Sequence, residues 1–284
     1  MSGLSKKKGG ENNLMLLAIT IWLFTLITVI LFTDLVPEML ELASGQWFPE
    51  SASVHGAIVD AQFYNTLMVT GVVFVLAQVA LGYLVLRYRE RPGQTAYYYH
   101  GSNKMEWAWT AATTVVFFLM VSVGYGVWLE VYVHAAPEDA IQIEVTAQQF
   151  AWNIRYPGPD GQFGIVRPEL IDDAAGNPLG LDPQDPAGED DLVVPTMAIP
   201  VNRPIELILR SKDVTHNFSV RELRLKQDTV PGMMIPLRFT ATKTGKYEIA
   251  CSELCGMGHH RMRSFLDVLS DQGYADWLED QSEF

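Results

Sequence analysis

The only two cysteines of the chain lie in one short run that also carries an imidazole and a thioether. Cys251 and Cys255 are four positions apart, and His259 and Met262 follow closely. Thiolate, imidazole and thioether are soft ligands that together favour copper over the hard cations. A single copper of the blue type needs one cysteine, so the second cysteine suggests two coppers that share a pair of bridging thiolates.

A thiolate-bridged copper pair also needs a second histidine to complete it. Three of the six histidines lie near the ends of apolar segments, and His260 would point away from its neighbour His259. His216 remains, at the start of a stretch in which apolar and polar residues alternate, a pattern that predicts a short strand. We therefore expect His216 to meet the cysteine run as a neighbouring strand end.

Each of these residues, taken alone, also has a less specific interpretation. Two cysteines outside the cytoplasm often form a disulfide, and the C-x3-C spacing allows a short one. Two cysteines with two histidines suit structural zinc, although zinc sites rarely recruit methionine. Met262 alone would fit as a core side chain, and His216 alone as an ordinary buried or surface histidine.

The joint pattern Cys-x-Glu-x-Cys-x-x-x-His-x-x-Met resembles subunit II of the haem-copper cytochrome c oxidases, which carries the dinuclear CuA centre. The likeness includes Asp-Val-x-His before the run and Val-Pro-Gly at 230–232, and it extends over about residues 62–270. It implies that the side chain of Glu253 also binds magnesium at the boundary with the catalytic subunit, as a hard oxygen donor can. The copper ligands that it implies are His216, Cys251, Cys255, His259, Met262 and the backbone carbonyl of Glu253.

Three apolar segments are long enough to cross a bilayer, which takes about 20 residues. They span 14–33, 66–86 and 107–129, and none holds a charged side chain. Basic residues before the first segment and between the second and third predict that these regions lie inside. We therefore expect a multi-pass protein of a bacterial-type inner (plasma) membrane, with its soluble domain on the periplasmic or extracytoplasmic side.

The first apolar segment departs from the resembling family, which usually has two membrane helices in this subunit. Its basic start is typical of a signal peptide, but its apolar stretch is long for one and no clear A-x-A cleavage site follows. We expect a retained third helix or uncleaved anchor in an N-terminal part at 1–36. A two-helix membrane hairpin at 37–134 and a soluble domain at 135–284 would follow.

The soluble part reads as many short strands separated by glycine and proline, with clear alternation at 141–145 and 205–209. Such a pattern is typical of a sandwich or a Greek-key barrel. The resemblance implies a cupredoxin-like barrel with the copper loops at one end. The expected fold is therefore N-terminal transmembrane α-helices followed by an all-β cupredoxin-like Greek-key barrel.

One stretch of the soluble part, at 157–191, is rich in proline, glycine and acidic residues. That composition buries little apolar surface and favours an irregular, solvated acidic loop. The alternative is a calcium site, because carboxylates suit that ion. Its ligands would be Asp182, Asp185, Asp190 and Asp191.

Charge bears on the electron donor, since the chain has a formal net charge of −13 and its soluble part carries most of the acidic excess. Such a domain repels nucleic acid and attracts a basic electron carrier. In the resembling family the donor is cytochrome c, and Asp213 matches one of its docking residues. Phe150 replaces the first tryptophan of the family's Gln-Trp-x-Trp run, where electrons enter, and Trp152 matches the second. Both are candidates for electron uptake, although phenylalanine has no N–H and is harder to oxidise.

The remaining expectations concern the whole complex. Glu106 matches a family glutamate at a proton-uptake entrance, a position where a carboxylate can accept protons from the cytoplasm. The chain contains no Cys-x-x-Cys-His motif, so we expect no covalently attached haem. The resemblance implies a subunit that takes electrons from cytochrome c, or from a cytochrome-bearing complex, and passes them to haem in catalytic subunit I. Subunit III would be a further partner, and oxygen reduction to water would drive proton translocation.

Three other functions compete with this interpretation. They are a copper-free quinol oxidase subunit, a CuA subunit serving nitric oxide or nitrous oxide reduction, and a mononuclear copper carrier.

Overall fold

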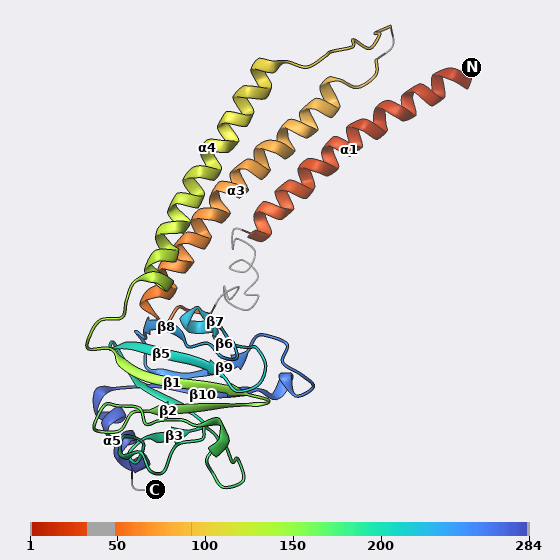
Figure 1. The fold of residues 1–284 in the computed structure, drawn as a ribbon. Helices are drawn as coiled ribbons and strands as arrows, with labels where there is room; N and C mark the ends of the chain where they lie inside the picture. The colour runs from red at the N-terminus through yellow and green to blue at the C-terminus, as the bar shows by residue number, and fades with distance from the viewer. Residues whose placement is uncertain (1, 33–48, 92, 283–284) are drawn as a thin grey trace. The chain divides into compact units, whose positions relative to one another are not determined.

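The computed structural model describes residues 2–32, 49–91 and 93–282 (Figure 1). These residues fall into two compact units, one holding 2–32, 61–91 and 93–124 and the other holding 49–60 and 125–282. The expected domain boundary at residue 36 lies outside the described residues. The second unit combines the soluble domain with residues 49–60. The sequence did not predict this association.

Three long helices carry the apolar segments that the sequence predicts. They are α1 (Ser2–Phe32), α3 (Val54–Arg87) and α4 (Asn103–Trp128), and a short π-helix (Leu129–Val133) continues the last one. Each is long and apolar enough to cross a membrane. Each helix begins before the predicted apolar span, at residue 2 rather than 14 in α1, at 54 rather than 66 in α3 and at 103 rather than 107 in α4.

The first helix packs against the second at a glycine. A Cβ atom on Gly82 of α3 would lie 2.2 Å from Nε1 of Trp22, so the indole occupies the space that a larger residue would fill. Ala18 and Thr25, on the same face of α1 as Trp22, are buried. Close approach through small residues is the usual way in which membrane helices associate. The contact is consistent with the expected third helix, whose retention stays a prediction.

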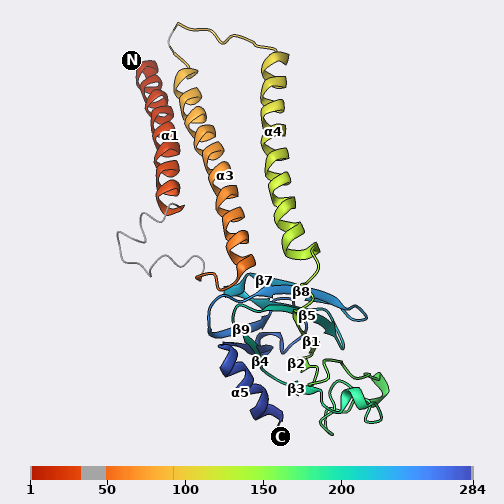
Figure 2. The ribbon, with the colours of Figure 1, turned by 90° about the vertical axis from the view of Figure 1, so that its left-hand side faces the viewer.

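The soluble domain consists of two five-stranded sheets (Figure 2). One has the order β3-β2-β1-β5-β8 and the other the order β4-β10-β9-β6-β7. The strands are β1 (Ile141–Gln148), β2 (Ala151–Tyr156), β3 (Leu192–Val194), β4 (Met197–Pro200), β5 (Pro204–Ser211), β6 (His216–Val220), β7 (Leu225–Thr229), β8 (Ile235–Thr240), β9 (Gly245–Cys251) and β10 (Arg263–Leu269). Most neighbours are antiparallel, but β1 pairs with β5 and β4 pairs with β10 in parallel.

Alternating side chains from both sheets form one core, as the strand pattern predicts. In β5 the inward residues Ile205, Leu207 and Leu209 are buried while the residues between them are half-buried. The core also takes in the cysteine run, because Cys251 and Cys255 belong to the same buried cluster. A C-terminal helix, α5 (Asp271–Ser282), lies beside β4 (Figure 2). The fold is thus the expected cupredoxin-like arrangement, with an added helix.

The acidic stretch 157–191 is mostly exposed or half-buried, and its carboxylates bind backbone N–H groups and arginines. Asp185 accepts a hydrogen bond from the Ile165 N–H at 2.6 Å. Arg155 of β2 is buried, and its Nε lies 3.0 Å from Oδ2 of Asp191. This buried arginine fastens the stretch to the first sheet. Two short 3-10 helices lie within it, Pro168–Leu170 and Pro186–Gly188.

The calcium alternative finds no support in this stretch. Arg167 Nε lies 2.7 Å from Oδ2 of Asp182, and this hydrogen bond lowers the pKa of the carboxyl group. Asp190 accepts from the Asp160 N–H. Each of the four aspartates therefore has its own partner. Among the described residues, the one group of three or more ligand side chains close enough to hold a metal ion lies elsewhere, at His216, Cys251 and Cys255.

Candidate metal centre

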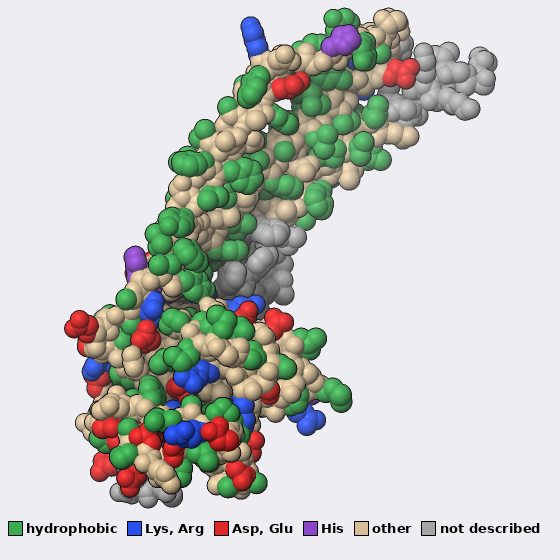
Figure 3. Space-filling view, viewed as in Figure 1, with side chains coloured by type: hydrophobic (Ala, Val, Ile, Leu, Met, Phe, Trp, Pro, Cys, Tyr) green, Lys and Arg blue, Asp and Glu red, His purple; other side chains and the backbone are tan. Residues whose placement is uncertain are grey.

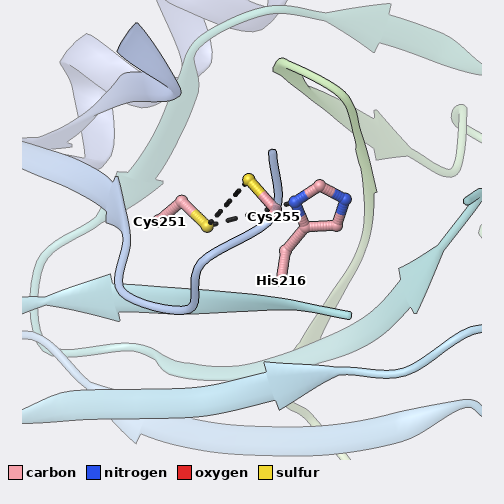
Figure 4. Close-up of side chains that lie close together, drawn as sticks. All are labelled: His216, Cys251 and Cys255. Atoms are coloured by element: carbon pink, nitrogen blue, oxygen red, sulfur yellow. Dashed lines mark hydrogen bonds between the residues drawn. The ribbon is translucent and has the colours of Figure 1, made fainter. Parts of the chain in front are cut away.

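Strand pairing brings the expected histidine and the first cysteine together. His216 is the first residue of β6 and Cys251 is the last residue of β9. The two strands are antiparallel neighbours, with Phe218 opposite Cys251. The loop after β9 then turns Cys255 back toward both residues, as Figure 4 shows. The expectation that His216 would meet the cysteine run as a strand end is confirmed.

The first half of the cluster surrounds Cys251. Its Sγ lies 4.0 Å from Nδ1 of His216 and 3.2 Å from the carbonyl oxygen of Glu253. The Sγ atoms of Cys251 and Cys255 are 3.8 Å apart, whereas a disulfide bond is about 2.05 Å long. Both cysteines are free thiols here, so the disulfide alternative does not describe this arrangement.

The second half surrounds Cys255. Its Sγ lies 3.5 Å from Nδ1 of His259 and 3.8 Å from Sδ of Met262. The side chains of Cys255 and Met262 are buried. Each half therefore offers one imidazole, one cysteine sulfur and one weak outer donor. A short 3-10 helix, His259–Arg261, spaces the imidazole and the thioether.

The donor set fits a pair of copper ions better than one zinc ion. Two thiols, two imidazoles, a thioether and a carbonyl oxygen gather in one place, which is more than a four-coordinate zinc site takes. Neighbouring donor atoms in the cluster lie 3.5–4.0 Å apart, close enough for two of them to bind the same metal ion. The methionine is a soft ligand that suits copper.

The carboxylate of Asp213 orients the buried His216 ring through the nitrogen that faces away from the sulfurs. Oδ1 of Asp213 lies 2.8 Å from Nε2 of His216, and the N–H of Gln149 donates to Oδ2 of Asp213 at 2.7 Å. Burial raises the pKa of Asp213, but hydrogen bonds from His216, Gln149 and Val214 outweigh it and lower the pKa. With its proton on Nε2, the His216 ring presents Nδ1 to the sulfurs, as a metal-binding histidine requires. The sequence assigned Asp213 to docking and did not anticipate this contact.

The pKa of the Cys255 thiol is raised. Burial, together with the hydrogen bond and charge of Cys251, raises the pKa of Cys255 to about 11. Thiolates bind metals and thiols do not, so metal binding must displace these protons. The buried pair is therefore poised for a cation that binds sulfur strongly.

The two aromatic candidates for electron uptake lie at different depths. The side chain of Phe150 is 37% exposed and that of Trp152 is 2% exposed. A Cβ atom on Gly258 would lie 2.3 Å from Cδ2 of Phe150, so this ring rests on the loop that carries the cysteines. Trp152 is in the core, with its ring centroid 6.4 Å from that of His216. Of the two, Phe150 alone reaches solvent, and Trp152 cannot touch a docked protein.

Sequence reasoning missed Gln149, which ties two ligand-bearing loops together. Its side-chain Nε2 donates to the carbonyl oxygen of Cys255 at 2.5 Å, while its backbone N–H donates to Asp213. A glutamine beside an aromatic residue gives no sequence signal for such a bridge. Of the remaining candidates, Glu253 has an exposed side chain and Glu106 lies in the first turn of α4.

Comparison with known proteins gives a consistent picture. Residues 188–268 match the family model described as cytochrome c oxidase subunit II, periplasmic domain. An alternative cytochrome c oxidase subunit 2 from Bradyrhizobium diazoefficiens is 35% identical over 248 residues, which cover 87% of this chain and 88% of the relative. A cytochrome c oxidase subunit 2 from Cereibacter sphaeroides is 28% identical over 222 residues, covering 75% of this chain and 72% of the relative.

Solved structures include the periplasmic domain of subunit II of cytochrome oxidase of Bradyrhizobium japonicum, with 28% identity and a TM-score of 0.39. The match covers 52% of this chain and 98% of that one. The helices fit a membrane-anchored protein, and the matched family domain is periplasmic. The 248-residue alignment with the Bradyrhizobium diazoefficiens relative is longer than the β domain, so it includes membrane segments as well. This chain therefore belongs to the cytochrome c oxidase subunit II family.

Proposed function

We propose that the chain is the subunit of a respiratory terminal oxidase through which electrons enter. The observation that carries the proposal is the division of the donor cluster into two matching halves around shared sulfurs. A dinuclear CuA centre bound there would accept and release one electron at a time. The residues that would hold it are His216, Cys251, Cys255, His259 and Met262, with the carbonyl oxygen of Glu253.

The surrounding side chains keep such a centre dry and fixed in place. His216, Cys255 and Met262 are buried, so few water molecules would have to reorient when the charge of the site changes. Asp213 holds the His216 ring in one orientation, and Gln149 holds the Cys255 carbonyl. Ligands that do not move between two charge states favour rapid electron transfer in both directions.

The donor in this proposal is cytochrome c or a cytochrome-bearing complex. Phe150 is the partly exposed apolar contact next to the cysteine loop, and Asp213 is part-exposed on the same side. Electrons would tunnel across Phe150, since its ring is difficult to oxidise. The buried Trp152 would serve as packing or as an inner relay beside His216.

The acceptor is haem in catalytic subunit I, a separate chain, with subunit III as a further member of the complex. Four electrons passed in this way reduce one oxygen molecule to water, coupled to proton translocation. We assign proton uptake at the inner surface to Glu106 and a magnesium ion at the subunit boundary to the exposed Glu253 carboxylate. The names of the relatives, which are oxidase subunits, support oxygen as the final acceptor.

Metal analysis of the purified full-length chain tests the copper assignment. We expect two copper ions and no stoichiometric zinc, with copper strongly reduced in His259→Ala. The exposed neighbouring histidine provides the matched control, because His260→Ala should keep both ions. One copper per chain would favour the mononuclear carrier, and a copper-free protein would favour the quinol oxidase subunit.

A further inference from the structure

Arg224 of the β domain forms an ion pair with Asp60, near the start of α3. We infer that this pair positions the copper-bearing domain for electron transfer to the haem of the catalytic subunit. Arg224 Nε lies 2.7 Å from Oδ1 of Asp60, and Arg224 Nη2 lies 2.9 Å from Oδ2. Two parallel N–H···O bonds fix geometry as well as charge. The inference rests on the proposed function, because it concerns the route by which an electron leaves this chain.

The remaining donors of Arg224 are also used. Nη2 donates to the carbonyl oxygen of Pro49 at 2.7 Å, and Nη1 donates to that of Arg221 at 2.8 Å. The backbone of Arg224 has φ +57°, a left-handed conformation that is uncommon for a residue with a side chain. Its side chain is only 10% exposed. Most exposed ion pairs contribute little, but this pair is shielded and geometrically fixed.

Hydrogen bonds from the Ser53 side chain and the Ala52 backbone hold the start of α3 against the same turn. Ser53 Oγ caps the helix by accepting from the Gly56 N–H at 2.9 Å, and it donates to the carbonyl oxygen of Leu223 at 2.7 Å. The Ala52 N–H donates to the carbonyl oxygen of Glu222 at 2.8 Å. Ala52 and Ser53 are both buried. The helix therefore starts from inside the β domain rather than from a free linker.

This anchor is connected directly to a copper ligand. β7 begins at Leu225, one residue after Arg224, and pairs with β6. At the far end of that pairing Thr229 lies opposite His216. The Arg224–Asp60 ion pair is therefore connected to the copper ligand His216 through the paired strands β7 and β6. A shift of about 1 Å at a reacting pair can cost on the order of 100-fold in rate, so a fixed helix origin matters.

The test uses the intact oxidase and two measurements. A light-activated reductant gives one electron to the copper site and is itself oxidised by one electron. The electron then passes to the ferric haem, which becomes ferrous, and the rate of that second step is recorded. Electron paramagnetic resonance of the same sample reports the copper site itself. We expect Arg224→Gln and Asp60→Asn to slow the step by roughly tenfold or more while the copper spectrum is unchanged. Arg224→Lys, which keeps the charge and loses the fork, should fall between.

Arg221→Gln is the matched control, because this arginine lies in the same turn with its side chain 77% exposed, and it should keep the normal rate. Normal rates in both Arg224→Gln and Asp60→Asn would overturn the inference. Loss of the copper spectrum in those variants would also overturn it, since the pair would then support the fold of the domain and not its placement. Absence of a dinuclear copper spectrum in the unaltered protein would contradict the proposed function instead, and the inference with it.

Discussion

His216 shows how much of the candidate site depends on residues that bind no metal. Its ring would bind through Nδ1 because Asp213 takes the other nitrogen, and Asp213 is itself held by the Gln149 N–H. The same glutamine reaches the Cys255 carbonyl through its side chain. One short segment after β1 therefore fixes ligands that come from two different loops. At the scale of single residues, the supporting hydrogen bonds are as specific as the ligands.

Asp213→Asn tests this support. The amide is a weaker acceptor for the His216 N–H, so the ring should be less well oriented, and we expect copper affinity to fall by about 10–100-fold. A competition titration with a copper chelator measures the change. The exposed carboxylate of Glu248 on β9 supplies a control, because Glu248→Gln should bind copper normally. Equal copper affinities in Asp213→Asn and Glu248→Gln would contradict this role and leave Asp213 only as a candidate docking residue.

The loop after β9 is the element that sets the shape of the site. Gly258 leaves room for the ring of Phe150, which a Cβ atom would meet at 2.3 Å. Either the ring or the loop must move if that space is filled. The loop carries Cys255 on one side of this contact and His259 on the other, so its path controls both halves of the cluster.

We expect Gly258→Ala to distort the copper site through this contact. The visible and paramagnetic spectra of the copper-loaded protein should change, and Phe150→Leu in the same chain should restore them in part by removing the rigid ring. Gly126→Ala, where nothing lies within 4 Å of the added atom, is the control and should leave the spectra as they are. A normal spectrum for Gly258→Ala would mean that the ring moves away freely.

Tyr156 links the first sheet to β4 and gives the domain a pH-dependent stability. Burial raises its pKa well above 10, and its hydroxyl both donates to and accepts from the backbone of Ala198 at 2.8 Å. Unfolded tyrosine ionises near pH 10 while the folded residue does not. The stabilisation is therefore present below pH 10 and is lost as the pH rises above it.

Tyr156→Phe should lower the free energy of unfolding by about 1–3 kcal/mol at neutral pH, because the Ala198 N–H loses its acceptor. Above pH 10 the difference from the unaltered protein should shrink. Denaturant unfolding at both pH values measures it, and Tyr97→Phe, in an exposed loop, should have no effect. A difference that is independent of pH would show that the folded tyrosine ionises normally.

The sequence predicts some strands of the β domain and not others, and the reason lies in which side chains are buried. The sequences of β1 and β5 alternate apolar and polar residues; in β5 only one face is fully buried, whereas in β1 residues 143–147 are all buried. The position of His216 followed from the alternation in β6. β7 reads LKQDT, and its inward residues Gln227 and Thr229 are polar, so its sequence does not alternate although its burial does. β4 is buried throughout and does not alternate. Contacts between distant segments, such as Arg224 with Asp60 or Phe150 with Gly258, leave no periodic trace in the sequence.

At the scale of the whole molecule, apolar and charged surfaces are separated between its parts. Figure 3 shows hydrophobic side chains along the helices and charged side chains over the β domain. The chain carries a net charge of −13, and its acidic stretch at 157–191 is fastened to the first sheet by Arg155. Asp173 of that stretch also pairs with Lys212, at 3.0 Å, next to Asp213. Lys212 offsets the charge of Asp173, and the negative charge at the end of the domain that holds the metal cluster comes from Asp213 and the exposed Glu253.

Such a surface predicts electrostatic attraction of the electron donor. Turnover with a basic cytochrome c should fall as ionic strength rises, because salt screens the long-range attraction that speeds encounter. An acidic cytochrome provides the comparison and should react slowly at every salt concentration. Turnover with the basic cytochrome that does not change with salt would argue for a permanently docked donor.

The central claim is that the cysteine cluster holds two coppers that share one unpaired electron. Electron paramagnetic resonance of the purified, oxidised protein tests it most directly, because coupling to two equivalent copper nuclei gives a seven-line pattern. We predict that pattern in the unaltered protein and its loss in both Cys251→Ser and Cys255→Ser. A four-line pattern, or no copper signal at all, would contradict the account.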